Sequence, residues 1–188
     1  MPPFTQIAAF QRAEDIYGKE GLSSKNTTLV LDLLLSTDKG AGFTILRNGI
    51  GSSNSSTSNF MNSIEPFSPG SPSAGPHYVW DRNDSGQFPL AQAAYDRGLV
   101  NLYSNAWSAP GYMKINGDEN NGAYADYIVQ WARFYKQSDV KVPNIGFLNE
   151  PEFAATYADM LSDGVHAAEF IRVLAKAVKA SFMNLAMN

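Results

Sequence analysis

The sequence predicts an α/β fold built from about four successive parallel βα units in its 188 residues. Short apolar runs alternate with longer segments whose apolar residues recur at helical spacing, which is the pattern of parallel βα units. No internal repeat or linker divides the chain, so residues 1–188 are expected to belong to one domain. Because a closed (β/α)₈ TIM barrel needs about 250 residues, the chain is expected to form its amino-terminal half, a partial barrel.

The individual elements follow from local sequence. Apolar runs predict strands at residues 4–10, 43–46, 99–103 and 145–148. Helical spacing predicts helices at residues 29–35, 90–97, 124–135 and 157–178. Asn26 and Thr27 are candidate caps of the first helix, and Pro89 opens the second. The aromatic residues of the third helix are expected to be core. The buried face of the fourth is expected to be Met160, Leu161, Val165, Ala168, Ile171 and Leu174.

Residues 52–86, between the second strand and the second helix, are rich in Ser, Pro, Asn and Gly. A loop this long inside a compact domain is most often functional or a lid. Trp80 is therefore a candidate for lining a groove that binds substrate. The alternative is a surface loop anchored by its aromatic side chains, and the sequence leaves both open.

Composition restricts the class of partner. The net charge is −4 and no basic cluster occurs, so nucleic acid is not an expected partner. No run of about 18 apolar residues predicts a membrane span, and the first residues lack the features of a signal peptide. The absence of cysteine excludes disulfides and thiolate metal sites. Glycosylation sequons begin at Asn26, Asn54 and Asn83 and favour secretion.

The segment 145–152 is the most informative part of the sequence. Its apolar run stops at Asn149 and Glu150, and Pro151 prevents the strand from continuing. Glu150 is thereby expected at the carboxyl end of a buried strand, where parallel barrels carry their chemistry. A glycosidase needs such a carboxylic acid, held rigidly and partly desolvated, to protonate a departing sugar oxygen. Alternatively, Glu150 caps the following helix.

Polar and aromatic side chains are also expected after the other strands. Arg47 and Asn48 follow the second predicted strand, and Trp107 follows the third. Aromatic rings stack on pyranose faces, amides bind hydroxyls and guanidinium groups orient carboxylates. Because the ends of parallel strands converge, this combination favours a carbohydrate site.

Three motifs carry a resemblance to a known family. Residues 46–53 (LRNGIGSS), 105–114 (NAWSAPGYMK) and 147–151 (FLNEP) resemble glycoside hydrolase family 30. The similarity is greatest to its fungal branch of secreted endo-xylanases, with endo-β-1,6-galactanases and glucosylceramidases as relatives. It extends from about residue 9 to residue 179.

The resemblance implies retaining hydrolysis by two glutamates on a (β/α)₈ barrel, with no cofactor. It implies that Glu150 is the general acid/base and that Asn149 bonds the 2-hydroxyl of the sugar in the reactive subsite. It assigns Arg47 to keeping the nucleophile ionised and Trp107 to a wall of the cleft. The implied substrate is xylan or glucuronoxylan, with β-1,6-galactan and glucosylceramide as alternatives.

Arg12 matches a position near the cleft of members that cut glucuronoxylan. There an arginine forms a bidentate pair with a glucuronate carboxylate. The alternative is a salt bridge on a helix surface to Glu14 or Asp15, and the sequence leaves both open.

The sequence also departs from the family pattern. The family's nucleophile comes from the seventh strand, and four βα units end before the fifth. The chain is therefore expected to be truncated and inactive alone, and a non-catalytic remnant that at most binds sugar is the alternative. The full-length member is expected to be an extracellular monomer acting on a β-linked polysaccharide.

Overall fold

A computed structural model of the protein describes residues 6–8, 16, 22–53, 61–71, 74–99, 101–114, 121–154 and 158–183. These residues form a four-stranded parallel sheet whose strands follow one another in chain order. The strands are β1 (Gln6–Ala8), β2 (Ile45–Ile50), β3 (Asn101–Ala106) and β4 (Asn144–Gly146). The α-helices are α2 (Ser24–Leu35), α3 (Gln87–Tyr95), α4 (Asn121–Lys136) and α5 (Gly164–Met183), with a 3₁₀ turn, η1, at Gly111–Met113.

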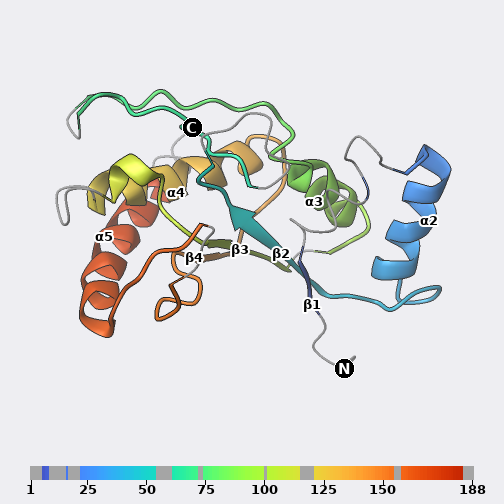
Figure 1. Ribbon diagram of the computed structural model, residues 1–188. Coiled ribbons are helices and arrows are strands. Elements are labelled where there is room, and N and C mark those ends of the chain that lie inside the picture. The colour runs from blue at the N-terminus through green and yellow to red at the C-terminus, as the bar shows by residue number, and fades with distance from the viewer. Residues whose placement is uncertain are drawn as a thin grey trace.

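The helices connect the strands as the sequence predicts. α2 lies between β1 and β2 in the chain, α3 between β2 and β3, and α4 between β3 and β4. Figure 1 shows α2, α3, α4 and α5 in the same order across the molecule as β1 to β4. An α/β fold of successive parallel βα units is therefore confirmed.

Strand pairing separates the side chains of the sheet into two faces. Arg47 of β2 pairs with Tyr103 of β3, and Gly49 pairs with Asn105. Because side chains alternate along a strand, these residues share one face, and Asn48 points to the other. Asn48 bonds to Tyr135 of α4, so the second face is the one that the helices cover. We call the face of Arg47 the inner face and the face of Asn48 the helix face.

The helix face carries an aromatic core. Trp131 and Tyr135 of α4 stack with ring centroids 4.1 Å apart, and Tyr127 is buried on the same helix. The predicted aromatic stripe of this helix is thus confirmed as core. A fully buried large side chain contributes about 1.5–3 kcal/mol by leaving water, so this helix anchors the sheet.

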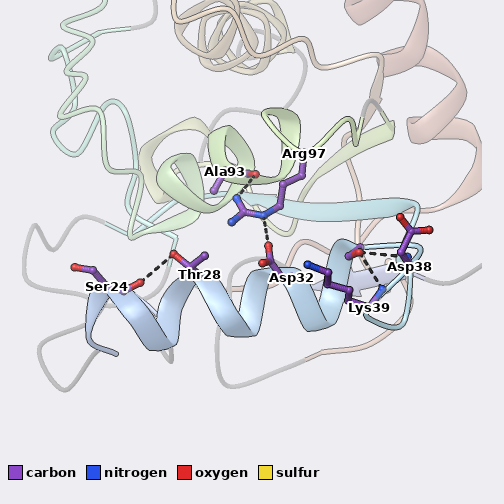
Figure 2. A network of polar contacts seen from close by, with 8 residues as sticks. Ser24, Thr28, Asp32, Asp38, Lys39, Ala93 and Arg97 are labelled. Carbon is purple, nitrogen blue, oxygen red and sulfur yellow. Dashed lines mark hydrogen bonds and ion pairs between the residues drawn. The ribbon is translucent and has the colours of Figure 1, made fainter.

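Polar contacts join α2 to α3 at the surface (Figure 2). The Arg97 guanidinium, just beyond α3, donates from Nε to Asp32 of α2 at 3.0 Å and from Nη1 to the carbonyl of Ala93. Both partners of this ion pair are partly exposed, and such pairs contribute about 0–1 kcal/mol. The contact between α2 and α3 therefore contributes little to stability.

Several element boundaries differ from the prediction. α2 starts at Ser24, and Ser23 is its cap, with Oγ accepting a bond from the Asn26 amide at 3.4 Å. Asn26 and Thr27 are therefore inside the helix rather than caps. β2 continues to Ile50 and β3 runs to Ala106, so residues placed after these strands belong to them.

The predicted buried face of the last helix is wrong for most of its residues. Of its residues, Leu174 is buried, whereas Leu161, Val165 and Ile171 are exposed. α5 instead packs through Phe170, whose ring lies 5.0 Å from Tyr124 of α4. The sequence is apolar on more than one side, and contact with α4 decides which side is buried.

The long loop between β2 and α3 is partly described. Within residues 61–71 and 74–86 it has no helix or strand, apart from an isolated bridge between Ser53 and Asn62. The Tyr127 hydroxyl bonds to Ser63 Oγ at 3.0 Å, and the Glu65 carboxylate accepts from the His77 amide at 2.9 Å. These contacts fix the described part of the loop against the body of the molecule.

In the part of the chain that the structure describes, the helices are too short or too polar to cross a membrane.

Candidate active site

A chain of polar contacts links Arg47, within β2, to the turn that follows β4. Arg47 donates from Nη2 to Oδ1 of Asn149 at 2.6 Å, and Asn149 donates from Nδ2 to Oε2 of Glu150 at 3.1 Å. Because a guanidinium only donates, the bond from Arg47 fixes the orientation of the Asn149 amide and turns its Nδ2 toward Glu150. The structure therefore brings together three residues that the sequence singled out.

Local sequence explains the position of Glu150. β4 ends at Gly146, and Pro151 has no amide hydrogen with which to continue the sheet. Glu150 has a left-handed backbone with φ of 47°, a conformation that costs about 1–2 kcal/mol for a residue other than glycine. Its carbonyl accepts a bond from the Phe153 amide at 2.9 Å, which closes a tight turn. The turn directs the chain away from the sheet at the carboxylate.

Glu150 itself is exposed, so the expectation that it is partly desolvated is not met. The alternative that it caps the next helix is wrong, because α5 begins only at Gly164. Asp163 has that position instead: its Oδ1 accepts from the amides of Val165 and His166 at 2.9 and 2.8 Å. These bonds, chiefly the one from His166, lower the pKa of Asp163. The sequence signal for this cap was an Asp directly before the helix.

Trp107 directly follows β3, the strand after which it was predicted, and Ser108 comes next. Trp107 is half-buried and Ser108 is buried. The Ser108 hydroxyl accepts from Lys114 Nζ at 2.9 Å, and that ammonium also donates to the carbonyl of Asp159 at 3.0 Å. Lys114 thus joins the loop after β3 to the loop after β4.

Asn48 is not in the candidate site, which corrects the prediction that it binds substrate. It is 0% exposed on the helix face, and its Nδ2 donates to the Tyr135 hydroxyl at 3.0 Å. The physical reason is strand periodicity. Arg47 and Asn48 are consecutive in β2, so their side chains must point to opposite faces of the sheet.

Trp80 is also outside the site, and the groove-lining role is corrected in favour of the anchoring alternative. Its ring stacks on Phe134 of α4 at 5.1 Å with an interplanar angle of 4°. It also contacts Phe88 of α3 edge-on at 5.4 Å. The tryptophan therefore fixes the long loop to the helices on the far side of the sheet from Arg47.

The carboxyl group of Asp84 is buried and contacts both α3 and α4. Asp84 accepts a bond from the Tyr135 hydroxyl at 2.6 Å and a longer one from Gln87 Nε2 at 3.3 Å. Burial raises the pKa of Asp84 to about 7, against the opposing effect of the Tyr135 bond. Burial likewise raises the pKa of Tyr135. Gln87 also holds both backbone groups of Gly49, accepting at 2.7 Å and donating at 2.9 Å.

Two inner-face residues were missed by the sequence reasoning. Asn105 is 2% exposed and Tyr103 is half-buried, and both belong to β3. Their side-chain tips lie over Gly146, where a Cβ would overlap both. The prediction ended this strand at residue 103 and assigned Asn105 to the following loop. Strand alternation counted from Arg47 across the register could have found it.

The other predicted functional residues are three asparagines in glycosylation sequons and one arginine. Asn26 and Asn83 are exposed, as sugar attachment requires. Asn54 and Arg12 lie outside the described residues, so their predicted roles stay predictions.

A cavity of about 500 Å³ lies behind the Asn149–Glu150 turn. It is lined by Phe147 and Leu148 before the turn, by Lys114, and by Tyr124 and Phe170 of the two flanking helices. The hydroxyl of Tyr124 donates to the Phe147 carbonyl at 2.9 Å. Across the described ranges, no group of three or more His, Cys, Asp or Glu side chains is arranged to hold a metal ion.

Comparisons with known proteins identify the family of the chain. The model of glycosyl hydrolase family 59 matches residues 22–186. Endo-1,6-beta-D-glucanase BGN16.3 of Trichoderma harzianum is 26% identical over 182 residues, covering 85% of this chain and 37% of its own length. Endo-1,6-beta-D-glucanase neg1 of Aspergillus fumigatus is 27% identical over 173 residues, with coverages of 78% and 36%.

The solved catalytic domain of GH30 xylanase C from Talaromyces cellulolyticus is 34% identical, with a TM-score of 0.81. The match covers 95% of this chain and 43% of that chain. The chain thus spans about two fifths of the length of the relatives it matches. By its family model the chain belongs to glycosyl hydrolase family 59, and it is similar in sequence and fold to part of the catalytic domain of a GH30 xylanase.

Proposed function

We propose that the protein containing this chain is a retaining endo-glycoside hydrolase that cleaves a β-linked polysaccharide on a closed (β/α)₈ barrel. The observation that carries the proposal is the chain of contacts from Arg47 through Asn149 to Glu150. It presents one carboxyl group to solvent at the carboxyl edge of a parallel sheet, where such folds carry their chemistry.

In this proposal Glu150 is the general acid/base. As an acid it protonates the leaving glycosidic oxygen, and as a base it later removes a proton from the attacking water. Asn149 is held by Arg47, which keeps its amide pointing at the carboxylate and available for a sugar hydroxyl. Trp107, half-buried after β3, supplies an apolar wall on which a pyranose ring can stack.

A retaining mechanism needs a second carboxylate about 5 Å from the first, to act as nucleophile. The relatives extend well beyond the part that this chain matches. We propose that the nucleophile comes from a strand that the match does not include, as the family resemblance implies.

Xylan is the proposed substrate, because the solved structure with 34% identity is described as a xylanase. β-1,6-Glucan is the second candidate, because two relatives are described as endo-1,6-beta-glucanases. An extracellular location fits either polymer and is supported by the exposed sequon residues Asn26 and Asn83.

The test compares Glu150→Gln with Glu152→Gln in the protein that contains this chain. Both glutamates are exposed in the same loop, which makes the second a matched control. We expect Glu150→Gln to abolish release of reducing sugar from xylan or β-1,6-glucan, and Glu152→Gln to leave it within about twofold. A wild-type protein that binds these polymers without cleaving either would indicate a non-catalytic sugar-binding protein.

A further inference from the structure

The side chain of Gln87 holds the carboxyl-terminal part of β2, the strand that carries Arg47. Gln87 is 0% exposed and is the first residue of α3. Its Oε1 accepts from the Gly49 amide at 2.7 Å, and its Nε2 donates to the Gly49 carbonyl at 2.9 Å. One side-chain amide thus binds both backbone groups of a residue two positions after Arg47, as the backbone of a neighbouring strand would.

This contact lies where the support of β2 by other strands changes. Among the described residues, β1 pairs with β2 from Ile45 to Arg47, whereas β3 continues beside β2 to Ile50. Past Arg47, the described strand pairing of β2 is therefore with β3 alone. Gln87 adds two hydrogen bonds from α3 at this point, so it helps to fix the β2 backbone where β1 no longer does.

The backbone directly before Gln87 is strained. Asp84 and Ser85 have left-handed backbones with φ of 49° and 55°. This conformation is unfavourable for residues other than glycine and persists only where surrounding contacts impose it. Asp84 accepts from the Tyr135 hydroxyl at 2.6 Å. Ser85 Oγ accepts from the Asn62 amide at 3.0 Å. The strained segment is thus held on both sides, and it places Gln87 against β2.

Gln87 is in this way connected to the candidate active site. Gly49 is two residues from Arg47, whose Nη2 donates to Asn149 at 2.6 Å. A shift of the β2 backbone would move the guanidinium, and a misplacement of about 1 Å in an active site can reduce the rate about a hundredfold. We propose that Gln87 is a positioning residue that acts through β2 on Arg47 and on its bond to Asn149. This inference rests on the proposed function and adds a residue to it.

The first experiment is a double-mutant cycle of Gln87→Met and Arg47→Lys in the protein that contains this chain. Methionine has a similar length but makes neither bond to Gly49. Gln87→Met should lower kcat/KM on xylan or β-1,6-glucan about tenfold in the wild-type background. It should lower kcat/KM less than about twofold beside Arg47→Lys, because a residue that acts through another loses its effect when that partner is changed. Equal falls in both backgrounds would overturn the proposal.

Ser63→Ala is the matched control for a loss of stability. Ser63 is also buried, and its Oγ bonds to the Tyr127 hydroxyl at 3.0 Å, which joins the long loop to α4 without touching β2. Both Ser63→Ala and Gln87→Met should lower the Tm, and only Gln87→Met should lower kcat/KM of the folded protein. A similar loss of kcat/KM in the two variants would mean that Gln87 has only a structural role.

The side-chain amide signals of Asn149 in isotope-labelled protein report the bond from Arg47 without turnover. They should shift in Gln87→Met and stay unchanged in Ser63→Ala, and unchanged signals in both variants would overturn the proposal. A shift found together with a fully active Glu150→Gln would contradict the proposed function but not the role of Gln87. If Gln87→Met does not fold, Gln87→Asn, which is one methylene shorter, replaces it in both measurements.

Discussion

The Arg47 guanidinium and the Asn149 side-chain amide are joined by a 2.6 Å hydrogen bond, although 102 residues separate them in the sequence. The bond connects the second strand of the sheet to the turn after the fourth. The side-chain nitrogen of Asn149 donates to the Glu150 carboxylate, so the position of that carboxylate depends on Arg47, which lies two strands away.

Arg47→Lys should therefore impair catalysis more than folding. Lysine keeps the charge but lacks the planar fork that reaches Asn149. Loss of a hydrogen bond to a charged group costs about 1.5–3 kcal/mol, which predicts a ten- to hundredfold fall in kcat/KM. Arg172→Lys, on the exposed surface of α5, is the matched control and should have no effect. Equal kinetics in the two variants would remove Arg47 from the site.

Asp84 predicts a pH dependence of stability. Its pKa is about 7 in the folded protein and near 3.8 when exposed, so the folded state binds the proton more tightly. Its contribution is fully present below about pH 4 and is lost as the pH rises to 7, at about 1.4 kcal/mol per pH unit. Above pH 7 no further loss follows, because both states are ionised.

Asp84→Asn removes this titration while keeping an acceptor for Tyr135. The stability difference between the variant and the wild type, measured by urea unfolding, should therefore grow in favour of the variant between pH 5 and pH 7 and then level off. Parallel stability curves for the two proteins would show that Asp84 is not protonated in the folded state.

Gly146→Ala should destabilise the protein, because the added methyl group would overlap Asn105 Oδ1 and the Tyr103 hydroxyl. Overpacking of this kind typically costs about 1–3 kcal/mol. Gly75→Ala is the control, because a Cβ there meets no atom within 4 Å. Chemical denaturation measures both variants, and equal stabilities would mean that the β3 side chains can move aside freely.

The turn at Glu150 could be predicted from sequence because its signals are local: an apolar run, an Asn-Glu pair and a proline. The core face of α4 was predictable for the same reason, since helical spacing is read within one segment. The position of Trp80 could not be predicted, because a tryptophan in a loop stacks on whichever apolar surface the fold brings near it, here Phe134.

The carboxyl ends of the strands were also predicted incorrectly from the sequence. The prediction ended β2 near residue 46 and β3 at residue 103, whereas they continue to Ile50 and Ala106. Because side chains alternate, a residue assigned to a loop has no assigned face. That is why Asn48 was expected in the cleft and Asn105 was overlooked.

The most direct test of Glu150 as acid/base is chemical rescue of Glu150→Ala in the protein that contains this chain. An aryl β-xylobioside with a good leaving group forms the glycosyl-enzyme without an acid, so only the second step lacks its base. Added azide, which needs no base, should restore turnover and give the β-glycosyl azide by NMR. Absence of rescue, or an α-azide product, would contradict the assignment of Glu150 in a retaining mechanism.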